Sequence, residues 1–152
     1  MSTIEGLKSI AWTVLGVLAE PTDSKIEATF DSGVVIHEYG PQTTALPFLG
    51  RDFKGFEGVK QYSNALSETL DILRMEWVEL VAEQKPSGLG GVVFTKGLGT
   101  FAIKRTQKHW NETFVNRVEV NEEGKIVRYE VFAVSGLLLL PYCGVLLRHY
   151  LR

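Results

Sequence analysis

The chain has 152 residues, of which 45% are hydrophobic and 22% are charged, as in a soluble globular protein long enough for one domain with a buried core. Its formal net charge of -2 gives no electrostatic reason to expect nucleic acid as a partner. A single cysteine, Cys143, excludes a framework of internal disulfides and fits a reducing location, which we expect to be the cytoplasm.

The first thirty residues predict two helices. Ser2 and Glu5 have the spacing of a capping box, so a helix is expected to begin near Thr3. Glu5 stands where a signal peptide would carry basic charge, which favours a helix of the mature protein over a secretion signal. A short second helix is expected to follow, capped by Thr22 or Asp23.

The middle of the chain predicts one more helix and three strands. The alternation of side chains and the spacing of apolar residues predict a strand at 34–39, a helix at about 59–73, and strands at 75–82 and 92–103. Gly97 and Gly99 lie inside the last of these strands, where glycines often mark a bulge or a strong bend.

A long hairpin is expected over residues 100–135, with its turn at 121–124. Alternate side chains of its first strand share one face: Trp110, Glu112, Phe114, Asn116, Val118 and Val120. Glu112 and Asn116 are polar on an otherwise apolar face, so each must find a partner, a cavity or water.

The order helix, helix, strand, helix and then a run of strands is typical of an α+β protein. We expect a strongly bent mixed or antiparallel sheet, wrapped with three helices from the N-terminal half of the chain into a half-open cone. The interior of such a cone would be an apolar pocket with a few polar groups.

Two segments share short motifs with a known family. One is GRDFKGFEGVKQYSNALSETL, at 50–70, and the other is NEEGKIVRYEVF, at 121–132. With the element order, they resemble the SnoaL-like branch of the nuclear transport factor 2-like superfamily. The resemblance covers roughly residues 4–135 of a single domain at 1–152, and leaves an apolar C-terminal extension at 136–152.

The resemblance implies a cone-shaped fold whose members include polyketide cyclases, ketosteroid isomerases, scytalone dehydratases and limonene epoxide hydrolases, and also non-catalytic binding and dimerisation modules. Relatives commonly carry an acid a few residues after G-K-I-x-R, whereas this chain has Val131-Phe132-Ala133-Val134 there. The catalytic aspartate of aldol-type cyclases therefore has no counterpart here. Asn116 stands where relatives often carry histidine.

Four residues are candidates for the chemistry. His37 and Tyr39 alternate on the strand at 34–39, where an imidazole could move a proton and a phenol could orient a substrate. Glu112 could act as a base with a pKa raised by an apolar site, and Asn116 could donate a hydrogen bond to a substrate oxygen. The alternatives are a hydrogen-bonded core or rim position for His37, an exposed Glu112, and an Asn116 that only satisfies its neighbours.

Aromatic residues would form the substrate-binding wall, if a cavity exists: Trp110, Phe114, Trp77 and Tyr62. We expect no cofactor and no metal, because the sequence lacks a phosphate-binding loop and a His-x-x-x-His or Cys-x-x-Cys spacing. Arg128 and Glu130 are expected to form a surface ion pair.

The chain carries no charged residue from Val131 to Leu147. Pro141 and Gly144 interrupt this run, so it is expected to plug the cone or pack in a dimer interface, with a membrane surface as a weaker alternative.

The sequence thus favours a cofactor-independent acid/base enzyme, an isomerase, cyclase or dehydratase, acting on a hydrophobic small molecule such as a polyketide or terpenoid intermediate. A homodimer is the expected assembly. The alternative is a non-catalytic ligand-binding or dimerisation module of the same fold.

Overall fold

The computed structural model describes residues 3–133, so the expectations for the extension at 136–152 lie outside the described residues. Within the described part, three helices are present: α1 (Ile4–Ala19), α2 (Asp23–Thr29) and α3 (Gly55–Thr69). Six strands accompany them: β1 (Phe30–Tyr39), β2 (Asp52–Lys54), β3 (Leu70–Gln84), β4 (Gly91–Ile103), β5 (Lys108–Val120) and β6 (Ile126–Ala133). The predicted element order is confirmed, with the short β2 as an addition.

The first two helices begin at threonine caps. The side chain of Thr3 accepts a hydrogen bond from the backbone N–H of Gly6 at 3.0 Å, and α1 begins at the next residue, as predicted. The side chain of Thr22 accepts from the N–H of Lys25 at 3.4 Å at the start of α2. Each cap satisfies a backbone donor that the first turn of a helix leaves without an internal partner.

The third helix lies about four residues earlier than predicted. Its predicted range of 59–73 is wrong at both ends, because α3 begins at Gly55 and ends at Thr69. Leu70 continues the apolar stripe of the helix but pairs with Ile103 as the first residue of β3. Sheet pairing therefore overrides the helical periodicity at this point.

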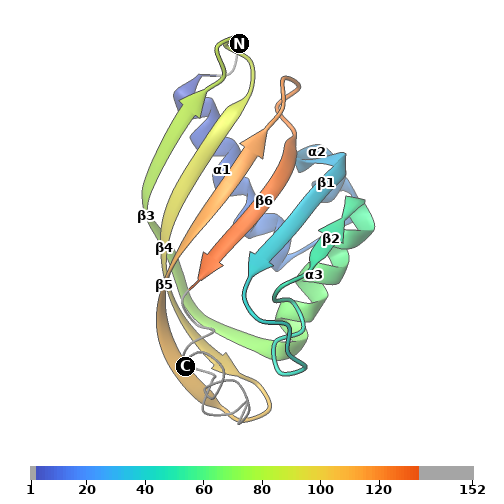
Figure 1. The fold of residues 1–152 in the computed structure, drawn as a ribbon, viewed down its shortest axis with the longest axis vertical. Coiled ribbons are helices and arrows are strands. Elements are labelled where there is room, and N and C mark those ends of the chain that lie inside the picture. The colour runs from blue at the N-terminus through green and yellow to red at the C-terminus, as the bar shows by residue number, and fades with distance from the viewer. Residues whose placement is uncertain (1–2, 134–152) are drawn as a thin grey trace, which may run out of the picture.

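The six strands form one mixed sheet in the order β2-β1-β6-β5-β4-β3. β1 and β6 are parallel, and every other neighbouring pair is antiparallel. All three helices lie on the same side of the sheet, and the long strands β3 to β5 curve strongly (Figure 1). The expected α+β fold with a bent mixed sheet is confirmed. We call the face that meets the helices the inner face and the opposite one the outer face.

Glycines on β4 allow aromatic rings to lie flat against the inner face. A Cβ atom at Gly97 would collide with the ring of Phe114, and one at Gly99 would collide with the ring of Phe101. The pairing of β3 with β4 also shifts register on both sides of these glycines, between Ile72 and Arg74 and between Trp77 and Glu79. The predicted irregularity at the two glycines is confirmed.

No helix in the part of the chain from 3 to 133 has both the length and the apolar character needed to span a membrane.

We expect Gly97→Ala to lower the free energy of unfolding by about 1–3 kcal/mol, because the new methyl group displaces the Phe114 ring from its seat on the strand. Urea unfolding measures the change. Gly16→Ala on α1 is the matched control: a Cβ there meets nothing within 4 Å, so the change should stabilise the helix by roughly 0.5–1 kcal/mol. Equal stability of the two variants would contradict this account of the bend.

Candidate functional site

A cavity of about 520 Å³ lies between the inner face of the sheet and the helices. This volume is within the usual range for a small-molecule site, roughly 300–1,000 Å³. Aliphatic and aromatic side chains make up most of its described wall, including Leu15, Leu18, Leu46, Phe48, Leu66, Leu70, Met75, Phe101 and Val131. A smaller set of polar groups faces the same space: Glu38, Tyr62, Glu112, Asn116 and Tyr129.

The Glu38 carboxyl is the most deeply buried acid of the cavity. Glu38 is 8% exposed, and its Oε2 accepts a hydrogen bond of 2.7 Å from the hydroxyl of Tyr62 on α3. Burial, with a smaller contribution from the negative charge of Glu112, raises the pKa of Glu38 to about 7, although the hydrogen bond from Tyr62 acts to lower it. A carboxyl with such a pKa can both accept and return a proton near neutral pH.

The loop between β1 and β2 folds back over this site. The backbone N–H of Gly50 donates to the carbonyl of Glu38 at 2.8 Å, and Leu49 forms a parallel bridge with Glu38. These contacts bring Leu46 and Phe48 into the cavity wall beside the carboxyl. The loop therefore helps to exclude water from Glu38.

Strand β5 contributes a second carboxylate and an amide. The indole N–H of Trp110 donates to Oε2 of Glu112 at 3.2 Å. Asn116 is 1% exposed, and neither its Nδ2 nor its Oδ1 has a hydrogen-bond partner. A buried amide without partners is costly, so a ligand group that donates to it or accepts from it would be favoured.

Tyr129 on β6 adds a phenol to the cavity. Burial and the negative charge of Glu38 both raise the pKa of its hydroxyl. The phenol therefore stays protonated at neutral pH and can serve as a donor.

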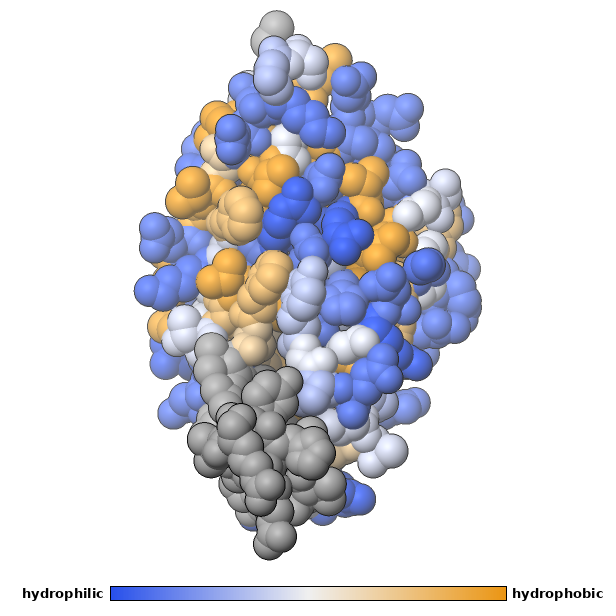
Figure 2. All heavy atoms as spheres, viewed as in Figure 1, coloured by the Kyte–Doolittle hydropathy of each residue, from blue (hydrophilic) through white to orange (hydrophobic). Residues whose placement is uncertain are grey.

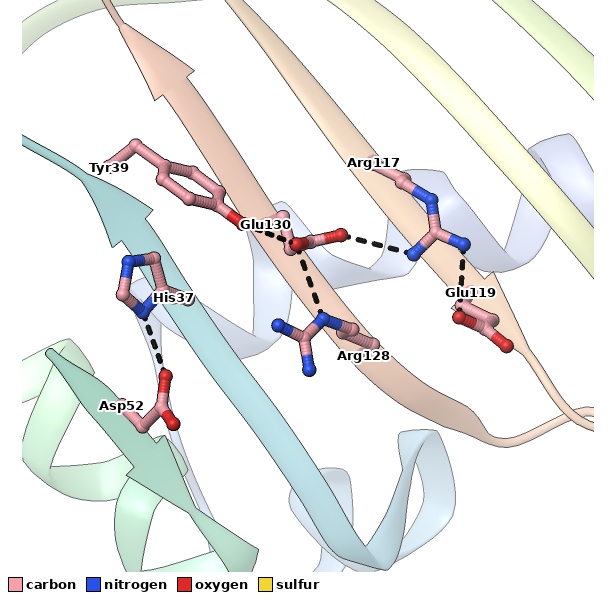
Figure 3. Close-up of polar contacts among 7 residues, drawn as sticks. All are labelled: His37, Tyr39, Asp52, Arg117, Glu119, Arg128 and Glu130. Carbon is pink, nitrogen blue, oxygen red and sulfur yellow. Dashed lines mark hydrogen bonds and ion pairs between the residues drawn. The ribbon is translucent and has the colours of Figure 1, made fainter. Parts of the chain in front are cut away.

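The structure brings five of the eight predicted site residues to the cavity: Glu112, Asn116, Trp110, Phe114 and Tyr62. Trp77 is buried on the inner face but is not among the described lining residues, and its ring lies 5.0 Å from that of Trp12. His37 and Tyr39 lie on the outer face, away from the cavity (Figure 3). The expectation that these two residues face the pocket is therefore corrected.

His37 and Tyr39 take part in polar contacts of the outer face. Nδ1 of His37 lies 2.7 Å from Oδ1 of Asp52, and the Tyr39 hydroxyl donates to Glu130 at 2.8 Å (Figure 3). Arg117 and Arg128 contact the same Glu130 carboxylate at 3.0 and 3.2 Å. The predicted ion pair of Arg128 with Glu130 is confirmed, but its expected surface position is wrong for Glu130, which is 7% exposed. Burial would raise the pKa of Glu130, but the hydrogen bonds from Tyr39, Arg128 and Arg117 lower it.

Sequence reasoning missed Glu38 because it assigned the wrong parity to β1. Val34 and Ile36, which share the parity of Glu38, are fully buried in the structure. The other parity also carries two hydrophobic residues, Val35 and Tyr39. A count of hydrophobic residues over 34–39 therefore does not distinguish the two faces of β1.

No group of three His, Cys, Asp or Glu residues within 3–133 is arranged to hold a metal ion. Among the described lining residues, Nζ of Lys104 lies 3.7 Å from Oδ1 of Asp71.

The fold is that of known proteins at low sequence identity. An NTF2-like protein from Burkholderia xenovorans aligns with a TM-score of 0.69 at 13% identity, over 93% of this chain and 98% of that one. A Mesorhizobium loti protein provisionally named a SnoaL-like polyketide cyclase gives 0.60 at 14%, over 83% and 97%. A ketosteroid isomerase-like protein from Erwinia carotovora gives 0.62 at 16%, over 87% and 96%. No family model matches the sequence, and no curated protein is detectably similar to it.

These likenesses confirm the NTF2-like fold, with a SnoaL-like protein among the structural neighbours. The identities are too low to transfer a reaction, because one fold hosts many functions.

The buried Glu38 predicts a loss of stability with rising pH. Its pKa is raised from 4.5 to about 7 on folding, so the unfolded chain releases the proton first as the pH rises. The free energy of unfolding should therefore fall by about 3 kcal/mol between pH 4.5 and 7, and it should stay at the lower value above pH 7. Glu38→Gln should remove this loss, and Glu79→Gln on an exposed position should not. The free energy of unfolding is measured in urea at each pH. If it changes with pH in the same way in the wild type and in Glu38→Gln, the burial of an ionisable Glu38 is contradicted.

Proposed function

We propose that this chain, which has the NTF2-like fold, is a cofactor-independent enzyme that moves a proton on a hydrophobic small molecule. An isomerisation, a cyclisation or a dehydration are reactions of this kind. The observation that carries the proposal is the Glu38 carboxyl, whose pKa is raised to about 7 in an apolar cavity that also holds the unpartnered amide of Asn116. A base with a pKa near the working pH is suited to abstracting a proton from carbon.

Each polar group of the cavity has a role in this proposal. Glu38 accepts the proton and returns it to another position of the substrate, and Tyr62 holds the carboxyl in place through its hydrogen bond. Asn116 donates to the substrate oxygen on which negative charge develops. Glu112, whose carboxylate accepts the hydrogen bond from Trp110, is a second group that can accept a proton from the substrate. Tyr129 is a further donor to the oxygen.

The proposed acid comes from a different strand than in the cyclases that the sequence resembles. Val131 and Ala133 line the cavity on β6, where those relatives carry an acid shortly after G-K-I-x-R. Glu38 on β1 and Glu112 on β5 supply the carboxyls instead. An aldol-type cyclisation is therefore less well supported than proton transfer that begins from Glu38.

A ligand-binding module without catalysis is the second candidate, and the apolar Val131 and Ala133 favour it. Such a protein would bind an apolar molecule in the cavity and return it unchanged. A measurement of proton transfer separates the two candidates.

We expect the chain to catalyse exchange of the acidic C–H protons of hydrophobic ketones with solvent deuterium, followed by NMR across a panel of ketones. Glu38→Gln should lower the exchange rate by about 10²–10⁴-fold, since it removes the base. The wild-type rate should rise as the pH increases through about 7 and level off above it, because the ionised Glu38 is the active form.

His37→Gln on the outer face is the comparison variant. Full exchange in His37→Gln together with its loss in Glu38→Gln assigns the base to the cavity. Loss of exchange in His37→Gln with full exchange in Glu38→Gln would instead assign the base to His37. Binding of ketones without exchange in the wild type would favour the non-catalytic module.

We also propose that the chain is a single domain that forms a cytoplasmic homodimer through the outer face of its sheet. Large apolar side chains cross this face from strand to strand: Val81, Phe94, Val115 and Phe132. Figure 2 shows hydrophobic residues beside hydrophilic ones on this face, and no helix within residues 3–133 covers it (Figure 1). The two arginines and two glutamates of the central network balance in charge, as suits a surface that meets a copy of itself.

Phe94→Asp should convert a dimer to a monomer, because it places a carboxylate at the centre of the proposed contact; Phe94 is 46% exposed. Size-exclusion chromatography with light scattering gives the mass. Ile4→Asp, which replaces another exposed apolar residue but at the start of α1, should leave the dimer intact. A monomeric wild type at micromolar concentration would refute the proposal.

A further inference from the structure

The side-chain amide of Asn116 lines the cavity with both of its ends unsatisfied. Asn116 is 1% exposed, and within residues 3–133 neither its Nδ2 nor its Oδ1 has a hydrogen-bond partner. Turning the amide over exchanges the nitrogen and the oxygen, and still leaves one donor and one acceptor unmet. Since the large majority of buried polar atoms in proteins have a partner, this amide points to a ligand.

The neighbours of Asn116 in the sheet do not satisfy the amide. Val131 lies opposite Asn116 on β6, and its side chain has no hydrogen-bonding group. Thr95 lies opposite Asn116 on β4, but its own hydroxyl is buried without a partner. Because directly opposite side chains are the nearest neighbours on one face of a sheet, we expect the partner of the amide to come from the cavity.

The two ends of the amide together select a class of ligand. A carboxylate offers only acceptors and would leave Oδ1 without a donor, whereas an ammonium group offers only donors and would leave Nδ2 without an acceptor. A ring that carries an N–H and a C=O on the same side meets both ends through two parallel hydrogen bonds. Such a ring is also neutral, so it enters an apolar cavity without the cost of burying a charge.

The position of Glu38 fits the same class of ligand. Val131 pairs with Asn116 on one side and with Glu38 on the other, so these two residues belong to one row across the sheet. Two strand spacings separate their Cα atoms, roughly 10 Å, and both side chains line the cavity. A ring bound to the amide can therefore extend toward the Glu38 carboxyl with the carbon beside its carbonyl.

We propose that the cavity takes a neutral cyclic amide, a lactam or a cyclic imide, whose ring N–H donates to Oδ1 of Asn116 and whose carbonyl accepts from Nδ2. An apolar substituent of the ring fills the interior, where Phe114 and Leu66 form part of the wall. This inference rests on the proposed function in one respect, because it names the substrate class of the same cavity. It does not depend on proton transfer by Glu38.

Three neutral probes of similar shape test the proposal. They are 4-phenylpyrrolidin-2-one, which has both groups, 1-methyl-4-phenylpyrrolidin-2-one, which lacks the N–H, and 3-phenylcyclopentanone, which keeps the carbonyl alone. Isothermal titration calorimetry on the full chain should show the lactam binding about tenfold or more tightly than either of the others, because each of them leaves Oδ1 of Asn116 without a donor. The ketone adds no bulk, so its weaker binding separates the lost hydrogen bond from a steric effect of the methyl group.

Asn116→Leu replaces the amide by an apolar side chain of similar size. It should bring the affinity for the lactam to within about twofold of that for the ketone. Thr95→Val is the matched control, because Thr95 lies opposite on β4, is also 1% exposed with an unpartnered hydroxyl, and is not among the described lining residues. It should keep the preference of the wild type for the lactam. Circular dichroism confirms that both variants are folded.

The proposal is overturned if the ketone or the N-methyl lactam binds as tightly as the lactam, if Asn116→Leu leaves the preference for the lactam unchanged, or if none of the probes binds. These results are separate from those of the exchange assay, since binding is measured without turnover. A chain that prefers the lactam but exchanges no protons would lose the enzymatic proposal and keep this one. A chain that exchanges the protons of ketones without preferring the lactam would do the opposite.

Discussion

The carboxyl of Glu38 inside an apolar cavity is the constraint on which the site depends. An ionised carboxylate in such surroundings is costly, and a single hydrogen bond from Tyr62 offsets part of that cost. The remainder appears as the raised pKa, which gives the group its capacity for acid/base work near neutral pH. The surrounding elements serve this arrangement: β1 carries the acid, α3 carries its partner, and the loop after β1 shields it from water.

Curvature of the sheet creates the space in which this carboxyl lies. Strands β3 to β5 curve strongly (Figure 1), and the cavity lies between the inner face of the sheet and the helices. Gly97 and Gly99 contribute because aromatic rings lie where their side chains would be. The same rings, Phe114 and Phe101, then form the wall of the cavity. A single local property, the absence of Cβ, thus affects both the packing of the sheet and the shape of the site.

Alternation of side chains along the strands divides the molecule into two chemical surfaces. On β1, Glu38 faces the cavity while His37 and Tyr39 face outward, although the three residues are consecutive. On β6, Tyr129 faces inward and Glu130 faces outward into contact with two arginines. The inner surface is apolar with few acids, and the outer one combines apolar side chains with balanced ion pairs. A shift of one residue in any strand would exchange the two sets.

The sequence by itself determined the order of the elements, the α+β class and the inward face of β5, because caps and alternation are local properties. Trp110, Glu112, Phe114 and Asn116 could be placed on one face from period-two spacing alone. Tertiary structure decided where α3 ends and β3 begins. In the sequence Leu70 continues the apolar stripe of the helix, but in the structure it pairs with Ile103 in the sheet. It also decided which parity of β1 faces the cavity, because that depends on the parallel pairing of β1 with β6, a contact between residues about ninety positions apart. The Glu38–Tyr62 pair follows from that choice, and the pKa of Glu38 follows from the burial that only the assembled cavity provides.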